Sequence, residues 1–217
     1  QAKMQILGGH TEVTAVVNQP VVNVAGVAKA KKGSLISTAG ARAGMDIVVS
    51  KWVGIEGTMI FAKEKEAELK EHFPADFVDT AIGFDRYLSV VPEAAVATQS
   101  SVAAMHDVTE GGLFGALWEM AEASGVGLEI DLKKIPIRQE TVEICEYFDV
   151  NPYGLISSGM MLMASADGNA LVLALQEAGI PATVIGKATE GNDRVIIRDE
   201  ERRFLEPPKT DELYKVL

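Results

Sequence analysis

The chain has 217 residues, of which 47% are hydrophobic and 24% charged, and its formal net charge is −11. This composition is that of a soluble globular chain, long enough for one large domain or two small ones. The negative charge argues against a nucleic-acid or anionic-membrane partner, because either would need clustered Lys and Arg.

No apolar stretch approaches the roughly 18 residues that cross a bilayer, and the first residues lack the charged-then-apolar order of a signal peptide. We therefore expect a cytoplasmic protein. The single cysteine, Cys145, excludes a disulfide framework. It lies in the helix-spaced apolar sequence TVEICEYF, so we expect a buried structural thiol rather than a nucleophile.

The first part of the chain contains two valine-rich segments, 3–13 and 20–28, that are typical of short strands. The segment 31–44, KKGSLISTAGARAG, is rich in glycine and serine and indicates a linker or a crossing between units. We therefore place a domain boundary here, dividing 1–34 from 35–217.

The next part of the chain predicts a strand at 46–50 and a helix from about 58 to 72, ended by Pro74. The region 75–99 is expected to be mostly helical, with breaks at Gly83 and Pro92.

Strand and helix alternate over the rest of the chain. Strands are expected at 102–108, 127–132, 159–165, 182–188 and 194–199, and helices at 112–124, 137–148 and 167–178. This alternation indicates an α/β or α+β fold.

The sequence HDVTEGGLFG at 106–115 carries the clearest motif. A strand that turns at a glycine pair straight into a helix leaves backbone N–H groups unpaired, which suits an anion. Asp107 and Glu110 could orient a hydroxyl, move a proton or hold a metal. The alternative is that Asp107 or Thr109 only caps the helix while Gly111 and Gly112 pack. His106 is expected to be a hydrogen-bonded structural residue rather than a base.

Three further turns combine glycine with polar residues, and some of the four are expected to converge on a ligand cleft. Each one alone is also compatible with a plain turn. Their candidate binding residues are Gly54, Glu56 and Gly57; Ser157, Ser158 and Gly159; and Gly8, Gly9, His10 and Thr11.

These segments also carry a resemblance to a known family. GGHTEV, NVAGVA, AGMDIVVS, GIEGT, MHDVTEGGLFGALWEMAEASGVG and SSGMMLMA follow the order and approximate spacing of the aminoimidazole ribonucleotide (AIR) synthase-like superfamily. That superfamily includes formylglycinamidine ribonucleotide synthase, selenophosphate synthetase, thiamine-monophosphate kinase and a carbamoyl-dehydrating hydrogenase-maturation protein. The chain most resembles the hydrogenase-maturation type and its uncharacterised AIR synthase-related relatives, over nearly its whole length.

The resemblance implies a two-domain protein that uses ATP and Mg²⁺ in its full-length form. In such a protein the N-terminal domain binds ATP and pairs with its twin through a shared β-barrel, while the C-terminal α/β domain closes a cleft over a small-molecule substrate. Residues 1–34 would then be the remnant of the ATP-binding and dimerisation domain, and 35–217 the AIR synthase-type C-terminal domain, with an α+β (α/β sandwich) fold. Because strands at 3–13 and 20–28 would leave backbone edges unpaired if they stood alone, we expect a homodimer or a missing partner segment.

The resemblance also assigns residues. Those that match the family's last N-domain turn, and would bind nucleotide, are Gly8, Gly9, His10 and Thr11. His10 stands where several members place an Asp that helps to hold magnesium nucleotide. Those that match the two segments facing the substrate cleft are Asp107, Thr109, Gly111, Gly112, Ser157, Ser158 and Gly159.

Two departures from the family limit these expectations. The chain begins at Gln1, at a position equivalent to late in the family's ATP domain, so we expect this segment alone not to hydrolyse ATP. The C-terminal sequence KTDELYKVL lacks the terminal cysteine that serves as carrier thiol in hydrogenase maturation, which argues against carbamoyl dehydration.

Three hypotheses follow. The chain is part of an ATP-dependent enzyme that phosphorylates an oxygen of a small substrate, or a non-catalytic ligand-binding relative, or an assembly module whose N-terminal strands pair with another chain.

Overall fold

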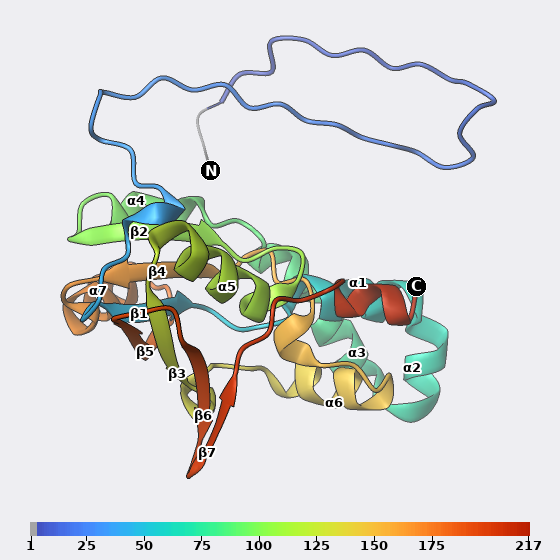
Figure 1. Cartoon of the computed structure of the whole chain (residues 1–217). Helices are drawn as coiled ribbons and strands as arrows, with labels where there is room; N and C mark the ends of the chain where they lie inside the picture. The colour runs from blue at the N-terminus through green and yellow to red at the C-terminus, as the bar shows by residue number, and fades with distance from the viewer. Residues whose placement is uncertain (1–3) are drawn as a thin grey trace. The chain divides into compact units, whose positions relative to one another are not determined.

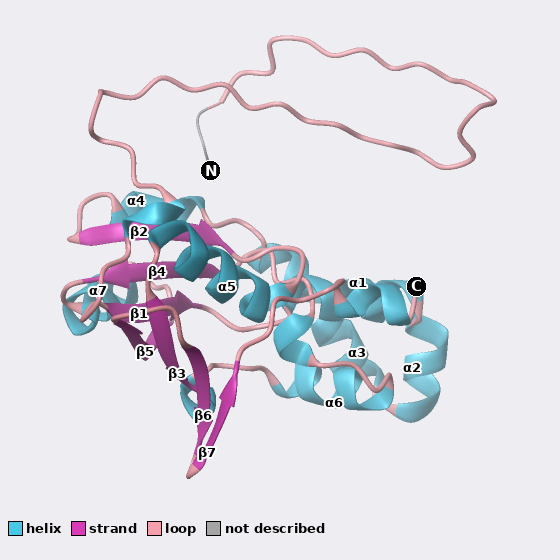
Figure 2. Cartoon of the chain, in the orientation of Figure 1, coloured by secondary structure: helices cyan, strands magenta, loops and turns pink. Residues whose placement is uncertain are grey.

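A computed structural model describes residues 4–217 and divides the chain into two units, Gln1–Leu35 and Ile36–Leu217. Residues 4–35 form turns and extended coil without a helix or strand (Figure 2). The strands expected at 4–13 and 20–28 are therefore wrong for the described residues, and position 3 lies outside them. The side chains of Ile6, Val13 and Val27 are 95–96% exposed. An isolated strand is unstable in water without a neighbouring edge to pair with, which explains the difference.

The second unit is built on a seven-stranded sheet within residues 36–217, with strand order β2-β4-β1-β5-β3-β6-β7 (Figure 1). Its strands are β1 (Asp46–Ser50), β2 (Val102–Asp107), β3 (Gly127–Asp131), β4 (Met161–Ser165), β5 (Ala182–Thr189), β6 (Arg194–Arg198) and β7 (Glu201–Phe204). Neighbouring strands are antiparallel except β3 and β6. Together with its helices, this sheet gives the expected mixed α/β fold.

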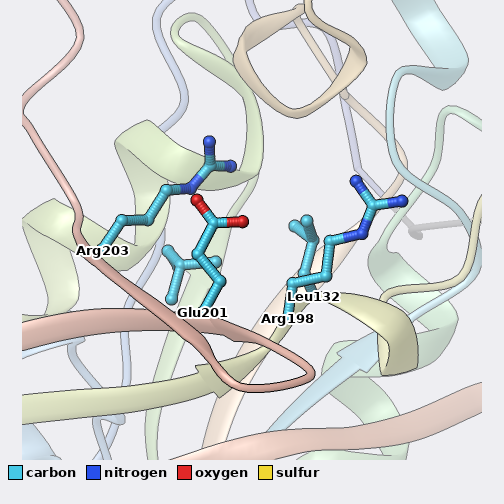
Figure 3. A pocket seen from close by; sticks show the side chains of 5 residues that line it. Leu132, Arg198, Glu201 and Arg203 are labelled. Carbon is cyan, nitrogen blue, oxygen red and sulfur yellow. The ribbon is translucent and has the colours of Figure 1, made fainter.

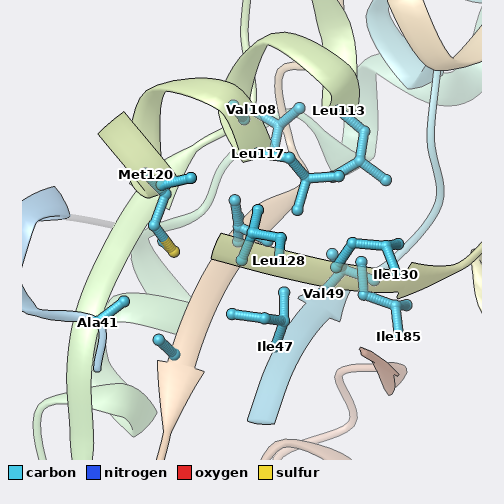
Figure 4. Packing of buried hydrophobic residues seen from close by; sticks show 14 of the residues in the cluster. Ala41, Ile47, Val49, Val108, Leu113, Leu117, Met120, Leu128, Ile130 and Ile185 are labelled. Carbon is cyan, nitrogen blue, oxygen red and sulfur yellow. The ribbon is translucent and has the colours of Figure 1, made fainter. Parts of the chain in front are cut away.

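Helices cover both faces of the sheet. Helix α5 (Gly112–Ser124) lies on one face, where Leu113, Leu117 and Met120 are fully buried against the strands (Figure 4). On the other face, α4 (Val91–Ala97) and α7 (Gly168–Glu177) bury the alternate strand residues. Strand β1 has neighbours on both sides and helices above and below, so its residues 47–49 form a continuous apolar run rather than an alternating one.

A group of four helices lies beside one end of the sheet (Figure 1). They are α1 (Ile55–Glu64), α2 (Glu66–His72), α3 (Ala75–Ile82) and α6 (Gln139–Tyr147), and they share a core that includes Phe61 and Ile144. Cys145 is 1% exposed in this core, as expected, and burial there raises the pKa of its thiol to about 12.

Several expected boundaries needed correction. The single helix expected at 58–72 begins earlier, at Ile55, and is split at Lys65, whose backbone is not helical. Pro92 does not break a helix but lies in the first turn of α4, where its missing N–H costs nothing. Strand β7 was not predicted, because its sequence Glu-Arg-Arg-Phe has no apolar alternation. None of the helices in residues 4–217 is long and apolar enough to cross a membrane.

Candidate functional site

Two of the predicted turns share one local geometry, a strand followed by a left-handed glycine and a helix. After β1, Gly54 has a φ of 72° and precedes α1. After β2, Gly111 and Gly112 have φ values of 81° and 62°, and α5 begins at Gly112. Only glycine adopts these conformations without strain, so the glycine pair is required by the turn itself.

Three of the four predicted turns converge. The Gly54 N–H donates to the Ser157 hydroxyl oxygen at 2.7 Å, and the Gly57 N–H donates to the Ile156 carbonyl at 3.0 Å. A Cβ at Gly112 would lie 2.6 Å from the carbonyl oxygen of Tyr153, so these two segments are in direct backbone contact. We call residues 50–58, 107–112 and 153–159 the turn cluster.

The alternative explanation of the motif is right for the glycines and wrong for the cap, because Gly111 and Gly112 pack closely against other segments but neither Asp107 nor Thr109 caps the helix. The N-cap of α5 is Gly111, and no side chain caps this helix. Asp107, Thr109 and Glu110 are exposed, and their side chains form no hydrogen bond or ion pair with the part of the chain that the structure describes. They are therefore available to a ligand.

The donors of this turn are already used in part. The Gly112 N–H donates to the Thr109 carbonyl at 3.0 Å, and the Gly111 N–H donates to the carboxylate of Asp211 at 2.6 Å. The anion that the turn was expected to suit is thus provided by the chain itself. Asp211 was not predicted as a site residue, although an Asp before the helix-forming sequence ELYK is a capping signal.

The other predicted residues of the turn cluster differ in their surroundings. Ser157 is fully buried and donates to the Leu155 carbonyl at 2.7 Å, so its hydroxyl has a structural role. Ser158 is half-buried, and Gly159 has a φ of 104°. Glu56 is half-buried, and its Oε2 atom is buried without a hydrogen-bond partner among the described residues.

A buried ion pair supports the cluster and was not predicted. Lys51 Nζ lies 2.8 Å from a carboxylate oxygen of Glu93, whose side chain is 0% exposed. The same ammonium group donates to the carbonyl oxygens of Tyr87, Ser89 and Gly159 at 2.8–2.9 Å. Four oxygens therefore surround it. The only sequence signal was a lysine directly after the apolar strand DIVVS.

His106 has the structural surroundings expected for it. Its Nε2 atom lies 2.6 Å from Glu119 Oε2, and its Nδ1 atom lies 3.3 Å from Thr38 Oγ1. The ring thus links the start of the second unit to β2 and α5.

The fourth predicted turn lies in the first unit. Gly8, Gly9, His10 and Thr11 are exposed there, and His10 lies 3.9 Å from Glu12. No group of three or more His, Cys, Asp or Glu side chains within residues 4–217 is gathered as a metal site requires.

A separate small cavity of about 60 Å³ lies on the β6–β7 hairpin. Figure 3 shows Glu201 between Arg203 and Arg198, with Leu132 on the side of Arg198. Arg203 also lies 6.0 Å from the centre of the Phe114 ring. None of these residues was a sequence candidate.

An aromatic pair connects the beginning of α5 with the 153–159 segment. The rings of Phe114 and Tyr153 stack with centroids 5.3 Å apart. Burial raises the pKa of the Tyr153 hydroxyl, while Arg198 and Arg203 act in the opposite direction.

Comparison with known proteins identifies relatives. A hydrogenase expression/formation protein of Methanocaldococcus jannaschii is 29% identical over 221 residues, which cover 100% of this chain and 64% of that protein. The carbamoyl dehydratase HypE of Cupriavidus necator is 30% identical over 173 residues, which cover 78% of this chain and 47% of that protein. The chain thus spans about half to two thirds of the length of these relatives.

A solved structure supports the same fold. The hydrogenase maturation protein HypE in complex with ATP superimposes with a TM-score of 0.63 at 20% identity, covering 82% of this chain and 55% of that one. The family model for the C-terminal domain of AIR synthase related protein matches residues 42–199. The resemblance found in the motifs is confirmed, and the chain belongs to the AIR synthase related proteins through this C-terminal domain.

Proposed function

We propose that this chain is part of an ATP-dependent enzyme that binds a small substrate at the turn cluster and activates one of its oxygens by phosphoryl transfer. The observation that carries this proposal is the convergence of three polar glycine turns beside exposed Asp107, Thr109 and Glu110. Family membership supports it, as do a relative named carbamoyl dehydratase and a similar fold solved with ATP.

In this proposal ATP supplies the phosphoryl group and the chain holds the acceptor. Asp107 accepts a hydrogen bond from the substrate O–H and takes the proton as the substrate oxygen bonds to phosphorus and ADP leaves. Thr109 and Glu110 orient the substrate. Phosphoryl transfer depends strongly on positioning, so the backbone contacts that fix this turn are the property that matters most.

The test is the release of ADP from MgATP by the protein as its gene encodes it, with a panel of small alcohols and amides as acceptors. We expect Asp107→Asn to lower kcat at least tenfold, because a positioned base typically contributes about 10²–10⁴-fold. Glu177→Gln is the matched control, because Glu177 is also exposed but lies at the end of α7. Equal loss in both variants, or none in Asp107→Asn, would refute the role of Asp107.

The two alternatives have separate signatures in the same protein. A ligand-binding relative would bind a fluorescent ATP analogue without releasing ADP. An assembly module would do neither, and would only change its mass with concentration in sedimentation velocity.

We also propose that residues 1–34 are the end of an ATP-binding and dimerisation domain and that the chain forms a homodimer through them. The exposed apolar side chains of this unit, such as Ile6 and Val13 at 96%, support a pairing partner. Replacing both with Lys should lower the dimer fraction in sedimentation without changing the unfolding midpoint of Ile36–Leu217. An unchanged dimer fraction would contradict this assignment.

A further inference from the structure

The C-terminal segment places a buried carboxylate inside the turn cluster. Asp211 is 1% exposed and accepts hydrogen bonds from three backbone N–H groups. Its Oδ2 atom lies 2.6 Å from the Gly111 nitrogen, and its Oδ1 atom lies 3.2 Å from the Ile156 nitrogen and 2.8 Å from the Leu213 nitrogen. The three donors come from segments far apart in the sequence.

Local capping explains only one of these bonds. Asp211 is the N-cap of the short turn Glu212–Lys215, and the Leu213 N–H is the donor that such a cap satisfies. The bonds from Gly111 and Ile156 are additional and long-range. They connect residues 107–112 with residues 153–159 of the turn cluster. The Ile156 carbonyl also accepts a hydrogen bond from the Gly57 N–H, which connects 153–159 with residues 50–58.

The backbone around this carboxylate is held in place on its other sides. A Cβ at Gly111 would lie 3.1 Å from Pro208 Cγ, so the C-terminal segment contacts this turn through a ring as well as a carboxylate. Leu205, a few residues earlier, is 6% exposed in the main core. Asp211 is thus fixed in the cluster by its own segment.

We propose that Asp211 is the built-in anion of the turn cluster and a positioning residue for its ligand-binding side chains. This role of Asp211 rests on the function proposed above. The Asp211 carboxylate takes the Gly111 and Ile156 amide donors, so an external phosphate or carboxylate group cannot use them. What the turn offers outward is the carboxylates of Asp107 and Glu110, which suit the part of a substrate that carries hydrogen-bond donors, such as a hydroxyl, amide or ammonium group.

The test removes the Asp211 carboxylate by mutation and then supplies a carboxylate from solution. In Asp211→Ala, amide hydrogen exchange at Gly111 and Ile156 should speed up about tenfold or more, while amides in β1 and β4 keep their protection. Adding sodium formate should restore the protection of both amides and raise the unfolding midpoint, with saturation. Sodium chloride at equal ionic strength should do neither. In the wild-type chain, formate and inorganic phosphate should leave the Gly111 amide signal unchanged.

Asp167→Ala is the matched control. Asp167 also caps a helix with its carboxylate, at 3.0 Å from the Ala170 nitrogen, but it lies at the start of α7. Formate should not change the Gly111 amide in this variant. If Asp211→Ala does not fold, Asp211→Asn preserves the shape, and its Gly111 exchange should still rise.

Two results would overturn the proposal. One is a wild-type Gly111 amide that responds to phosphate or formate, because the turn would then take an external anion with Asp211 in place. The other is a uniform rise in exchange across the sheet in Asp211→Asn, because Asp211 would then serve global stability alone. Neither measurement involves ATP. The proposed role of Asp211 can therefore be confirmed or refuted independently of ADP release.

Discussion

Removing the Lys51 ammonium should destabilise the protein more than any single surface change. In Lys51→Met the carboxylate of Glu93 would stay buried at 0% exposure without the cation that lies 2.8 Å away. Three carbonyl oxygens, including that of Gly159 in the turn cluster, would lose their donor.

The magnitude follows from the burial of both partners. Breaking a buried pair by removing one partner costs about 3–5 kcal/mol, because the remaining charge is uncompensated. Each kcal/mol lowers the unfolding midpoint of a domain of this size by about 2–4 °C, so we expect a fall of about 6–20 °C.

The assay is urea and thermal unfolding of three variants. Lys187→Met is the control, because the Lys187–Asp46 pair has a similar length of 2.7 Å but the lysine side chain is 64% exposed. That variant should lose at most about 1 kcal/mol. The double variant Lys51→Met/Glu93→Leu should recover more than half of the loss, since it removes the stranded charge. A loss below about 1 kcal/mol in Lys51→Met would refute the reasoning.

Three further predictions concern single groups. Gly112→Ala should cost about 2–4 kcal/mol in urea unfolding, because its φ is 62° and its Cβ would lie 2.6–2.8 Å from backbone atoms of the 153–155 segment; a loss below about 1 kcal/mol would show that the contact yields. The Cys145 thiol should resist Ellman's reagent at pH 8 until the chain is unfolded, because burial raises its pKa to about 12. Since the thiol pKa is 9.0 without burial, its contribution to the free energy of unfolding should fall as the pH rises from about 9 toward 12. The pKa of Asp46 is lowered by its hydrogen bonds with Lys187 and the Gly168 N–H, so its contribution to the free energy of unfolding is present above the unfolded pKa and lost as the pH falls through the folded pKa. Asp46→Asn should therefore make the free energy of unfolding less dependent on pH below about pH 4.

The parts of the fold that depend on nearby residues were predictable. Helix α5 was expected at 112–124 and is found there, because its apolar spacing and the glycines at both ends are local signals. The edge strand β7 was missed because its residues are exposed and charged, so no buried face marks it. The strand order was also beyond local pattern, since β1 pairs with β4 and β5, which come more than 100 residues later.

The candidate site shows the same division. The glycine turns were predictable because their backbone conformation needs glycine. That some of them would converge was also expected, but the sequence did not indicate which three of the four would do so. Asp211 was missed because its carboxylate meets Gly111 across 100 positions of sequence, and no short pattern records such a contact. Lys51 was missed because a lysine is normally exposed, and its burial depends on Glu93 and three carbonyls from other segments.

The contacts that join the turn cluster have a consequence for how such a site can change over time. In each hydrogen bond that joins the cluster a main-chain N–H is the donor, and the acceptors are the Ile156 carbonyl, the Ser157 hydroxyl and the Asp211 carboxylate. The side chains of Asp107, Thr109 and Glu110 are exposed and take no part in these bonds. If these outward residues bind the substrate as proposed, their substitution would alter what is bound and leave the frame intact. One frame of this kind can accept new substrates through a few exchanges at the same positions, with little loss of stability at each step.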